Sequence, residues 1–341
     1  MFSLDELRRA EAVVRAALAP TPAIAWPLIA RRLGAATLVK HENHNPTGAF
    51  KVRGGLTFVD ALKRRDPAAK GLISATRGNH GQSLAFAGAR AGLKVRIYVP
   101  HGNSAEKNAA MRALGAELVE HGDDFQAARE EAMRVAAESG LVAVPAFHRD
   151  LALGVATYAL ELLTTRPDLD VLYVPIGQGS GICGCVAARD ALGLKIEIVG
   201  VQASGAPAYA LSVAAGRAVA TERCDTLADG LATRIPDEEA LAVIRRGVAR
   251  VTLVDDDEIA AAIRAYWTDA HNLAEGAGAA PLAAALKERG RLAGKTVGLV
   301  LSGGNIDLDL FQRWAAPAVR SAPTNTQFAP DNARRHEGVI S

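Results

Sequence analysis

One lysine of this chain lies in an unusual setting, between turn residues and a glycine pair. Residues 45–55 read NPTGAFKVRGG, which puts Lys51 directly after Phe50 and shortly before Gly54 and Gly55. A lysine amine in an apolar wall is partly desolvated, and this lowers its pKa and makes it a nucleophile and base near neutral pH. An ordinary surface lysine is the alternative, since most lysines are exposed. The segment makes Lys51 a candidate for covalent chemistry with a carbonyl group.

A glycine-rich turn further along the chain is typical of an anion site. An apolar run at 171–177 leads into the sequence GQGSG, which comprises Gly177, Gln178, Gly179, Ser180 and Gly181. Glycines let backbone N–H groups approach a ligand closely, and the first turn of the Ala-rich helix expected next adds unpaired N–H groups. Such a loop most often binds phosphate.

The same turn also fits a dinucleotide-binding pattern, because residues 179–184 read GSGICG. That pattern requires an acidic residue about 20 positions later, at the end of the next strand. Residues 200–202 hold no carboxylate, and Glu197 lies at the start of that strand. An NAD-dependent oxidoreductase, a non-catalytic binding module and a plain structural turn stay open as alternatives. A phosphate cradle without a ribose anchor fits the residues best.

A lysine combined with a phosphate cradle indicates pyridoxal 5'-phosphate, which binds through a lysine Schiff base. Two further segments fit this cofactor. The sequence SATRGNHGQS (74–83) leaves an apolar strand and opens a helix near Asn79 and His80, where N–H groups can meet a substrate carboxylate. The sequence VLSGGNID (300–307) places Ser302 at the carboxyl end of another strand, where open α/β sheets bind ligands.

The scaffold that must position these residues is predicted by apolar runs alternating with Ala-rich segments. We expect strands at 71–75, 94–100, 116–122, 141–147, 171–177, 196–202, 250–254 and 296–303. We expect helices over 79–92, 104–116 and 124–140, and an amphipathic helix over the first 20 residues. Continuous apolar strands separated by helices are typical of parallel sheets buried on both faces, so the predicted class is α/β.

Composition narrows the function classes. The 341 residues carry 39 basic and 37 acidic side chains, a net charge of +2 that gives no reason to expect a nucleic acid or a membrane surface as partner. No apolar run approaches the roughly 20 residues of a spanning helix, and the N-terminus lacks the order of a signal peptide. Three cysteines are too few for a disulfide framework and favour a cytoplasmic location. Their spacing matches no zinc site, so no metal is expected.

Six motifs in order now carry a family resemblance: PTGAFKVRGG, TRGNHGQS, PIGQGSGICG, LADGLATR, EGAGAA and SGGNID. Over about residues 15 to 315 the chain resembles the fold-type II pyridoxal-phosphate enzymes, and within them the threonine/serine dehydratase and serine racemase group. The resemblance implies two open parallel-sheet α/β domains of the tryptophan synthase β-like architecture. It implies a large cofactor-binding domain (1–69 and 148–315), a small substrate-loop domain (70–147), a flexible C-terminal tail (316–341) and a homodimer.

The resemblance also assigns roles to single residues. Lys51 matches the Schiff-base lysine, which also takes the Cα proton. The residues that match cofactor contacts are Asn79, Gly177, Gln178, Gly179, Ser180, Gly181, Gly230, Glu275 and Ser302. Those that match the loop around the substrate carboxylate are Thr76, Arg77, Asn79 and His80. The implied reaction is loss of water and ammonia from a β-hydroxy amino acid, with threonine or serine as first choice. A bulkier or acidic substrate, such as 3-hydroxyaspartate, phenylserine or a hydroxyectoine-derived compound, is the alternative.

Two departures from the family pattern bear on function. Arg77 stands where the racemase has a serine that acts on the far face of the substrate, and a guanidinium exchanges protons poorly. We therefore expect dehydration with negligible racemisation, and Arg77 either pairs with a surface carboxylate or reaches a second acidic group of the substrate. The cation-binding carboxylates of that group should fall within 199–212, which holds Gln202 and no carboxylate. We therefore expect no dependence on a divalent cation there.

Overall fold

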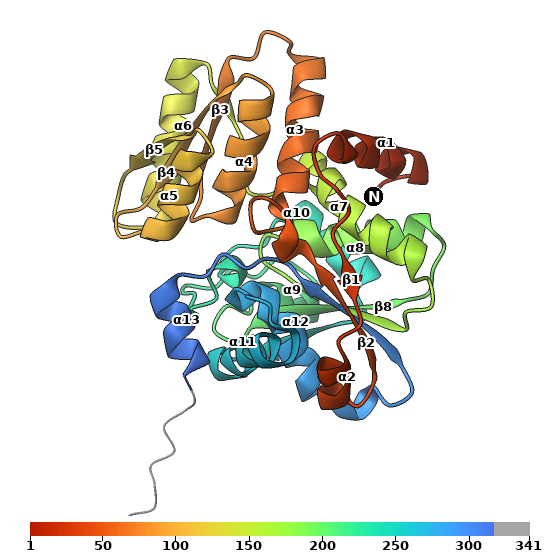
Figure 1. Ribbon diagram of the computed structural model, residues 1–341. Helices are drawn as coiled ribbons and strands as arrows, with labels where there is room; N and C mark the ends of the chain where they lie inside the picture. The colour runs from red at the N-terminus through yellow and green to blue at the C-terminus, as the bar shows by residue number, and fades with distance from the viewer. Residues whose placement is uncertain (317–341) are drawn as a thin grey trace, which may run out of the picture.

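Two sheets form the framework of the protein, which is described by a computed structural model over residues 1–316 (Figure 1). The larger sheet has six strands in the order β1-β2-β10-β7-β8-β9, with bounds β1 Ala23–Ile24, β2 Ala36–His41, β7 Val171–Pro175, β8 Glu197–Ala203, β9 Arg250–Val254 and β10 Thr296–Leu301. The smaller has four in the order β5-β4-β3-β6, with bounds β3 Gly71–Ala75, β4 Lys94–Val99, β5 Glu117–Glu120 and β6 Val142–Ala143. All pairs are parallel except β1 with β2.

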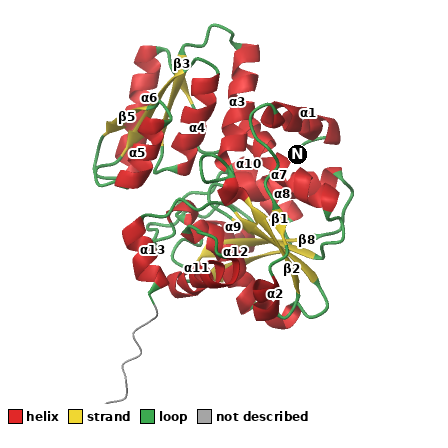
Figure 2. Cartoon of the chain, in the orientation of Figure 1, coloured by secondary structure: helices red, strands yellow, loops and turns green. Residues whose placement is uncertain are grey.

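Helices cover both faces of each sheet (Figure 2). The larger sheet packs against α1 Leu4–Arg15, α2 Pro27–Leu33, α7 Arg149–Thr165, α8 Ser180–Ala191, α9 Ala208–Ala215, α10 Glu238–Gly247, α11 Asp256–Ala270, α12 Gly276–Lys287 and α13 Leu308–Ala315. The smaller packs against α3 Lys51–Arg65, α4 Asn79–Arg90, α5 Ala105–Ala113 and α6 Phe125–Ser139. Three short 3₁₀ turns complete the chain: η1 Glu42–His44, η2 Asp229–Leu231 and η3 Arg289–Arg291.

The α/β class with two parallel sheets is confirmed, while some elements differ from expectation. The sequence analysis missed β1 and β2, although β2 lies inside the larger sheet between β1 and β10. The strand expected at 141–147 is shortened to β6, and Lys51 begins helix α3. The smaller sheet lies within 70–147, but the domain limits themselves stay a prediction. The predicted tail lies outside the described residues apart from Ala316.

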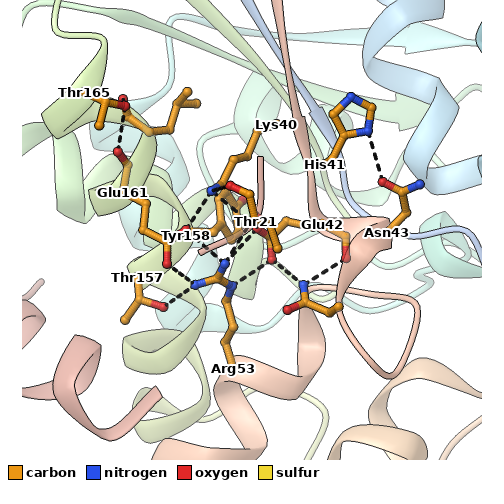
Figure 3. Close-up of polar contacts among 12 residues, drawn as sticks. Thr21, Lys40, His41, Glu42, Asn43, Arg53, Thr157, Tyr158, Glu161 and Thr165 are labelled. Carbon is orange, nitrogen blue, oxygen red and sulfur yellow. Dashed lines mark hydrogen bonds and ion pairs between the residues drawn. The ribbon is translucent and has the colours of Figure 1, made fainter. Parts of the chain in front are cut away.

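A buried ionic cluster ties the start of α3 to its surroundings (Figure 3). The Arg53 side chain has no solvent exposure, and its Nε and Nη2 donate to the two Glu42 carboxylate oxygens at 2.8 and 3.0 Å. Its Nη1 and Nη2 also donate to Glu161 at 2.8 and 3.1 Å. Lys40 Nζ donates to Glu161 at 2.7 Å and to the Thr21 carbonyl at 2.8 Å. The positive charges of Arg53 and Lys40 therefore balance the negative charges of the two glutamates in the protein interior.

We predict that Arg53→Met will lower the free energy of unfolding by about 3–5 kcal/mol, because removing one partner leaves a carboxylate buried without its counter-charge. Arg64→Met is the matched control, since Arg64 lies on the same helix, is 70% exposed and pairs with Asp60. That exposed pair should contribute at most about 1 kcal/mol. Urea unfolding of both variants measures the difference.

Equal losses in the two variants would contradict a stabilising role for the cluster. If Arg53→Met does not fold, Glu161→Gln replaces it, because the amide keeps the shape while removing one negative charge. Glu161→Gln should then lose more than the Arg64→Met control.

Candidate active site

Three segments that are far apart in the sequence are joined by backbone hydrogen bonds beside the end of β10. Phe50 N donates to the Ser302 carbonyl at 3.0 Å, and Glu275 N donates to the Gly303 carbonyl at 3.0 Å. Gly304 N donates to the Gly48 carbonyl at 2.9 Å. The residue before Lys51, the glutamate before α12 and the SGGN turn are therefore held together at the carboxyl end of the larger sheet. This is the edge where open α/β sheets bind their ligands.

The Lys51 amine points toward the glycine-rich turn. Its Nζ donates to Ser180 Oγ at 3.1 Å, and Ser180 is the first residue of α8. Burial lowers the pKa of Lys51 to about 8, and the charge of Glu275 offsets part of this shift. A substantial share of the amine is therefore neutral near physiological pH, which is the form that attacks a carbonyl carbon.

The glycine-rich turn has the geometry of an anion cradle. Gly179 takes the left-handed conformation, with φ of 99°, and no side chain caps α8. A Cβ atom on Gly179 would lie 2.7 Å from Ala240 Cβ, and one on Gly177 would collide with the Gly230 carbonyl oxygen. The first-turn N–H groups of α8 therefore face a turn that only glycine fits, and no side-chain oxygen competes for them. These residues fit a phosphate group, and a cofactor held there would find in Lys51 an amine for its aldehyde.

Asn79 and Glu275 meet from the two sheets. Asn79 Nδ2 donates to both Glu275 carboxylate oxygens, at 2.9 and 3.0 Å, and Asn79 Oδ1 accepts from Asn305 Nδ2 at 2.7 Å. Glu275 is 3% exposed. Burial, followed by the repulsion of Asp229, raises the pKa of Glu275 to about 7. The amide of Asn79 is thus held in one orientation at the start of α4.

The other predicted substrate-loop residues lie in different settings. Thr76 is buried, and its hydroxyl accepts from Gly78 N at 3.1 Å. His80 is buried, and desolvation and then the charge of Lys51 lower its pKa to about 3. Its Nε2 has no partner among residues 1–316. His80 is therefore a neutral ring with an unused polar atom, and it carries no charge at physiological pH.

Arg77 is exposed, and only its backbone carbonyl is engaged, by Asn103 Nδ2 at 3.2 Å. Of the two alternatives left by the sequence, pairing with a surface carboxylate is not seen within the described part of the chain. The guanidinium of Arg77 is consequently open to a ligand group.

Residues 199–212, where the sequence predicts no cation-binding carboxylates, are arranged around a buried amide. Gln202 is fully buried, and its Oε1 accepts from Ala210 N at 2.9 Å. Across residues 1–316, no group of three or more His, Cys, Asp or Glu side chains is arranged to hold a metal ion.

Some residues beside the site were missed by sequence reasoning. Asn305 lies inside the SGGNID motif, so its position beside Asn79 had a signal. Lys107 and Asp229 form an ion pair across the two sheets, and nothing in their local sequence indicates it.

Comparisons with known proteins identify the family to which the chain belongs. Residues 14–303 match the family model described as pyridoxal-phosphate dependent enzyme. An L-threonine ammonia-lyase of Geobacter sulfurreducens is 40% identical over 279 residues, which cover 81% of this chain and 69% of the relative. The structure of maize serine racemase superposes with a TM-score of 0.86 at 28% identity, covering 91% and 96% of the two chains. A pyridoxal 5'-phosphate-dependent aspartate racemase superposes at 0.85 and 28%, covering 90% and 97%.

The fold and the match together define a fold-type II enzyme that uses pyridoxal 5'-phosphate. The chain belongs to the threonine/serine dehydratase family of these enzymes, and its class of activity is that of an ammonia-lyase.

We predict that Glu275→Gln will make the protein without cofactor more stable above neutral pH. A carboxyl group whose pKa rises from 4.5 to about 7 on folding binds its proton more tightly in the folded state. Stability of the wild type is therefore lost as the pH rises between these two values. The difference between these two pKa values corresponds to about 3 kcal/mol. Urea unfolding at pH 4.5 and pH 8 measures the difference, and a stability difference between the two proteins that does not grow with pH would contradict the assignment.

Proposed function

We propose that the protein removes water and ammonia from L-threonine or L-serine and releases a 2-oxo acid. The observation that carries the proposal is the position of the Lys51 amine, 3.1 Å from the Ser180 hydroxyl at the uncapped start of α8. The start of α8 would hold the phosphate of the cofactor, and Lys51 would hold its aldehyde. The name of the 40% identical relative supports threonine as the first substrate to test.

Each residue of the candidate site has its own role in the proposed reaction. Pyridoxal phosphate, when bound, supplies an aldehyde for a covalent bond with an amine and a ring that accepts electrons. Gly177, Gln178, Gly179, Ser180 and Gly181 hold the phosphate in our proposal. Lys51 would hold the aldehyde of the cofactor and would also serve as the base for the proton on the substrate Cα. Its pKa of about 8 suits this role, because a base works best near the ambient pH.

The remaining residues would orient the cofactor and shape the space around it. Asn79 is held by Glu275 and Asn305, so its amide offers a fixed contact to the cofactor. Gly230 packs against Ala277, where an added Cβ atom would lie 2.8 Å from the Ala277 Cβ, and its carbonyl oxygen fills the space that a side chain at Gly177 would need. Ser302 offers a neutral hydroxyl to the ring nitrogen, which does not enforce protonation there as a carboxylate would. That favours elimination, in which the leaving hydroxyl removes charge quickly.

Substrate contacts are proposed for the loop of Thr76, Arg77, Asn79 and His80. His80 is neutral and Arg77 keeps its proton, so neither exchanges a proton with Cα opposite Lys51. This supports dehydration of one enantiomer with negligible racemisation. A substrate with a second carboxylate, such as 3-hydroxyaspartate, is the second candidate, favoured by the exposed guanidinium of Arg77.

We also propose a cytoplasmic homodimer. The three cysteines are free thiols, which suits a reducing compartment. Trp267 is 51% exposed and packs edge-on against Phe311, an apolar surface of the kind that subunit contacts cover. No helix within residues 1–316 has the length and apolar character needed to cross a membrane.

We predict that Lys51→Ala will abolish 2-oxo acid formation and the visible absorption band of the bound cofactor, while the fold stays intact. Only a primary amine at this place forms the covalent bond. Lys63→Ala, at the far end of the same helix, is the matched control and should keep both properties. Activity retained in Lys51→Ala would contradict the assignment of Lys51 as the lysine that binds the cofactor.

Arg77 decides between the two substrate classes. If a second carboxylate binds there, Arg77→Ala should lower kcat/KM for 3-hydroxyaspartate. The loss should be equivalent to about 1.5–3 kcal/mol of activation free energy, the scale of a charged hydrogen bond. The loss for L-threonine should be much smaller. Steady-state kinetics on both substrates gives the comparison, and equal losses would remove the second-carboxylate hypothesis.

A further inference from the structure

The first turn of α5 reaches across from the smaller sheet to the larger one (Figure 1). Ser104 Oγ donates to Asp307 Oδ1 at 2.5 Å, and Leu308 N donates to Glu106 Oε1 at 2.9 Å. Lys107 forms an ion pair with Asp229. Asp229 directly precedes Gly230, and Asp307 directly follows the SGGNI turn. All three contacts therefore join α5 to the two loops that border the proposed cofactor site.

Lys107 also touches the substrate loop itself. A Cβ on Gly78 would lie 2.7 Å from Lys107 Cδ, so the stem of the lysine packs directly on the loop between Arg77 and Asn79. The Lys107 side chain is only 11% exposed. Burial alone would lower its pKa, but the carboxylates of Asp229, Glu275 and Asp307 outweigh this effect and raise the pKa. Lys107 is therefore a charged side chain that contacts the loop with its stem and the opposite sheet unit with its amine.

This edge contains polar contacts instead of apolar packing. The buried residues of α5 are Asn108 and Met111, and Met111 packs in the apolar cluster of the smaller sheet. Asp229 is 38% exposed, so its pair with Lys107 is reached by water. Polar contacts of this kind contribute little each and break at low cost. A substrate needs an opening beside the loop at 76–80. Because the contacts between α5 and the larger sheet unit are polar, they can break to form this opening and then form again.

We propose that Lys107 is a positioning residue: its ion pair with Asp229 holds loop 76–80 closed over the substrate, and release of the pair opens the site. The ion pair shifts the balance between open and closed forms, and substrate gains affinity by the fraction of closed protein. The proposal rests on the proposed ammonia-lyase reaction only for its kinetic test. It adds a residue outside all of the family motifs named above.

The variant that tests it is Lys107→Met, which keeps the stem against Gly78 and removes the charge. The cofactor-loaded enzyme should show KM for L-threonine raised about fivefold, the upper range for loss of one partly exposed ion pair. The fall in kcat should be less than about threefold, because the closed form, once reached, has the same chemistry. Arg112→Met is the matched control, since Arg112 lies on the same helix and pairs with Glu120 inside the smaller sheet unit. It should leave KM unchanged.

A second measurement does not depend on turnover. Hydrogen exchange of backbone amides in 76–80, in cofactor-loaded protein without substrate, should be faster in Lys107→Met than in Arg112→Met. The exchanged-charge double variant Lys107→Asp with Asp229→Lys should recover part of the protection. If wild type turns over no β-hydroxy amino acid, the proposed reaction fails while this measurement still decides the role of Lys107.

Two results would overturn the proposal. Exchange rates and KM that match the Arg112→Met control would show that the ion pair does not hold the loop. A lower melting temperature with unchanged KM and unchanged exchange in 76–80 would assign Lys107 to stability alone.

Discussion

The position of Lys51 depends on the buried ionic cluster around Arg53, which lies two residues further along α3. The charges of this cluster balance. Arg53 is joined to Glu42, and Glu42 also accepts from Asn45 Nδ2 at 2.9 Å. The turn before Lys51 and the first turn of α3 are therefore fixed by one set of charged hydrogen bonds. Buried charges tolerate few arrangements, because each must keep its partner when water is absent. The position of the reactive amine follows from this constraint.

Two basic residues in the first turn of α3 show how the number of nearby carboxylates decides a charge state. Arg53 has Glu42 and Glu161 as partners, and their attraction outweighs desolvation, so its pKa stays above the usual range. Lys51 has no carboxylate within hydrogen-bonding distance among residues 1–316, and Glu275, with a pKa of about 7, is only partly charged. Desolvation then prevails and the pKa of Lys51 falls to about 8. One helix thus presents a permanent cation for structure and a titratable amine for chemistry.

Strands marked by a local apolar pattern were predicted from the sequence. Features that depend on partners far apart in the chain were missed. The strands 71–75, 171–175 and 250–254 were predicted within two residues, because continuous apolar runs are typical of buried strands. Strand β2 was missed since its last residues, Lys40 and His41, look exposed in sequence and are buried only through partners such as Glu161. The family motifs predicted the grouping of Lys51, Asn79 and Glu275. The pairing of Lys107 with Asp229 joins residues 122 positions apart, and no local pattern encodes it.

The division of the site between two sheets has a physical reason. The proposed phosphate cradle at Gly179 requires close backbone contacts, which a rigid strand–turn–helix unit on the larger sheet provides. The loop at 76–80, for which we propose substrate contacts, belongs to the smaller unit and meets the larger one through polar side chains. Asn79 bridges the two by its bonds to Glu275 and Asn305. In the open form that we propose, this bridge would be broken, so closure of the loop and orientation of the Asn79 amide would be one event.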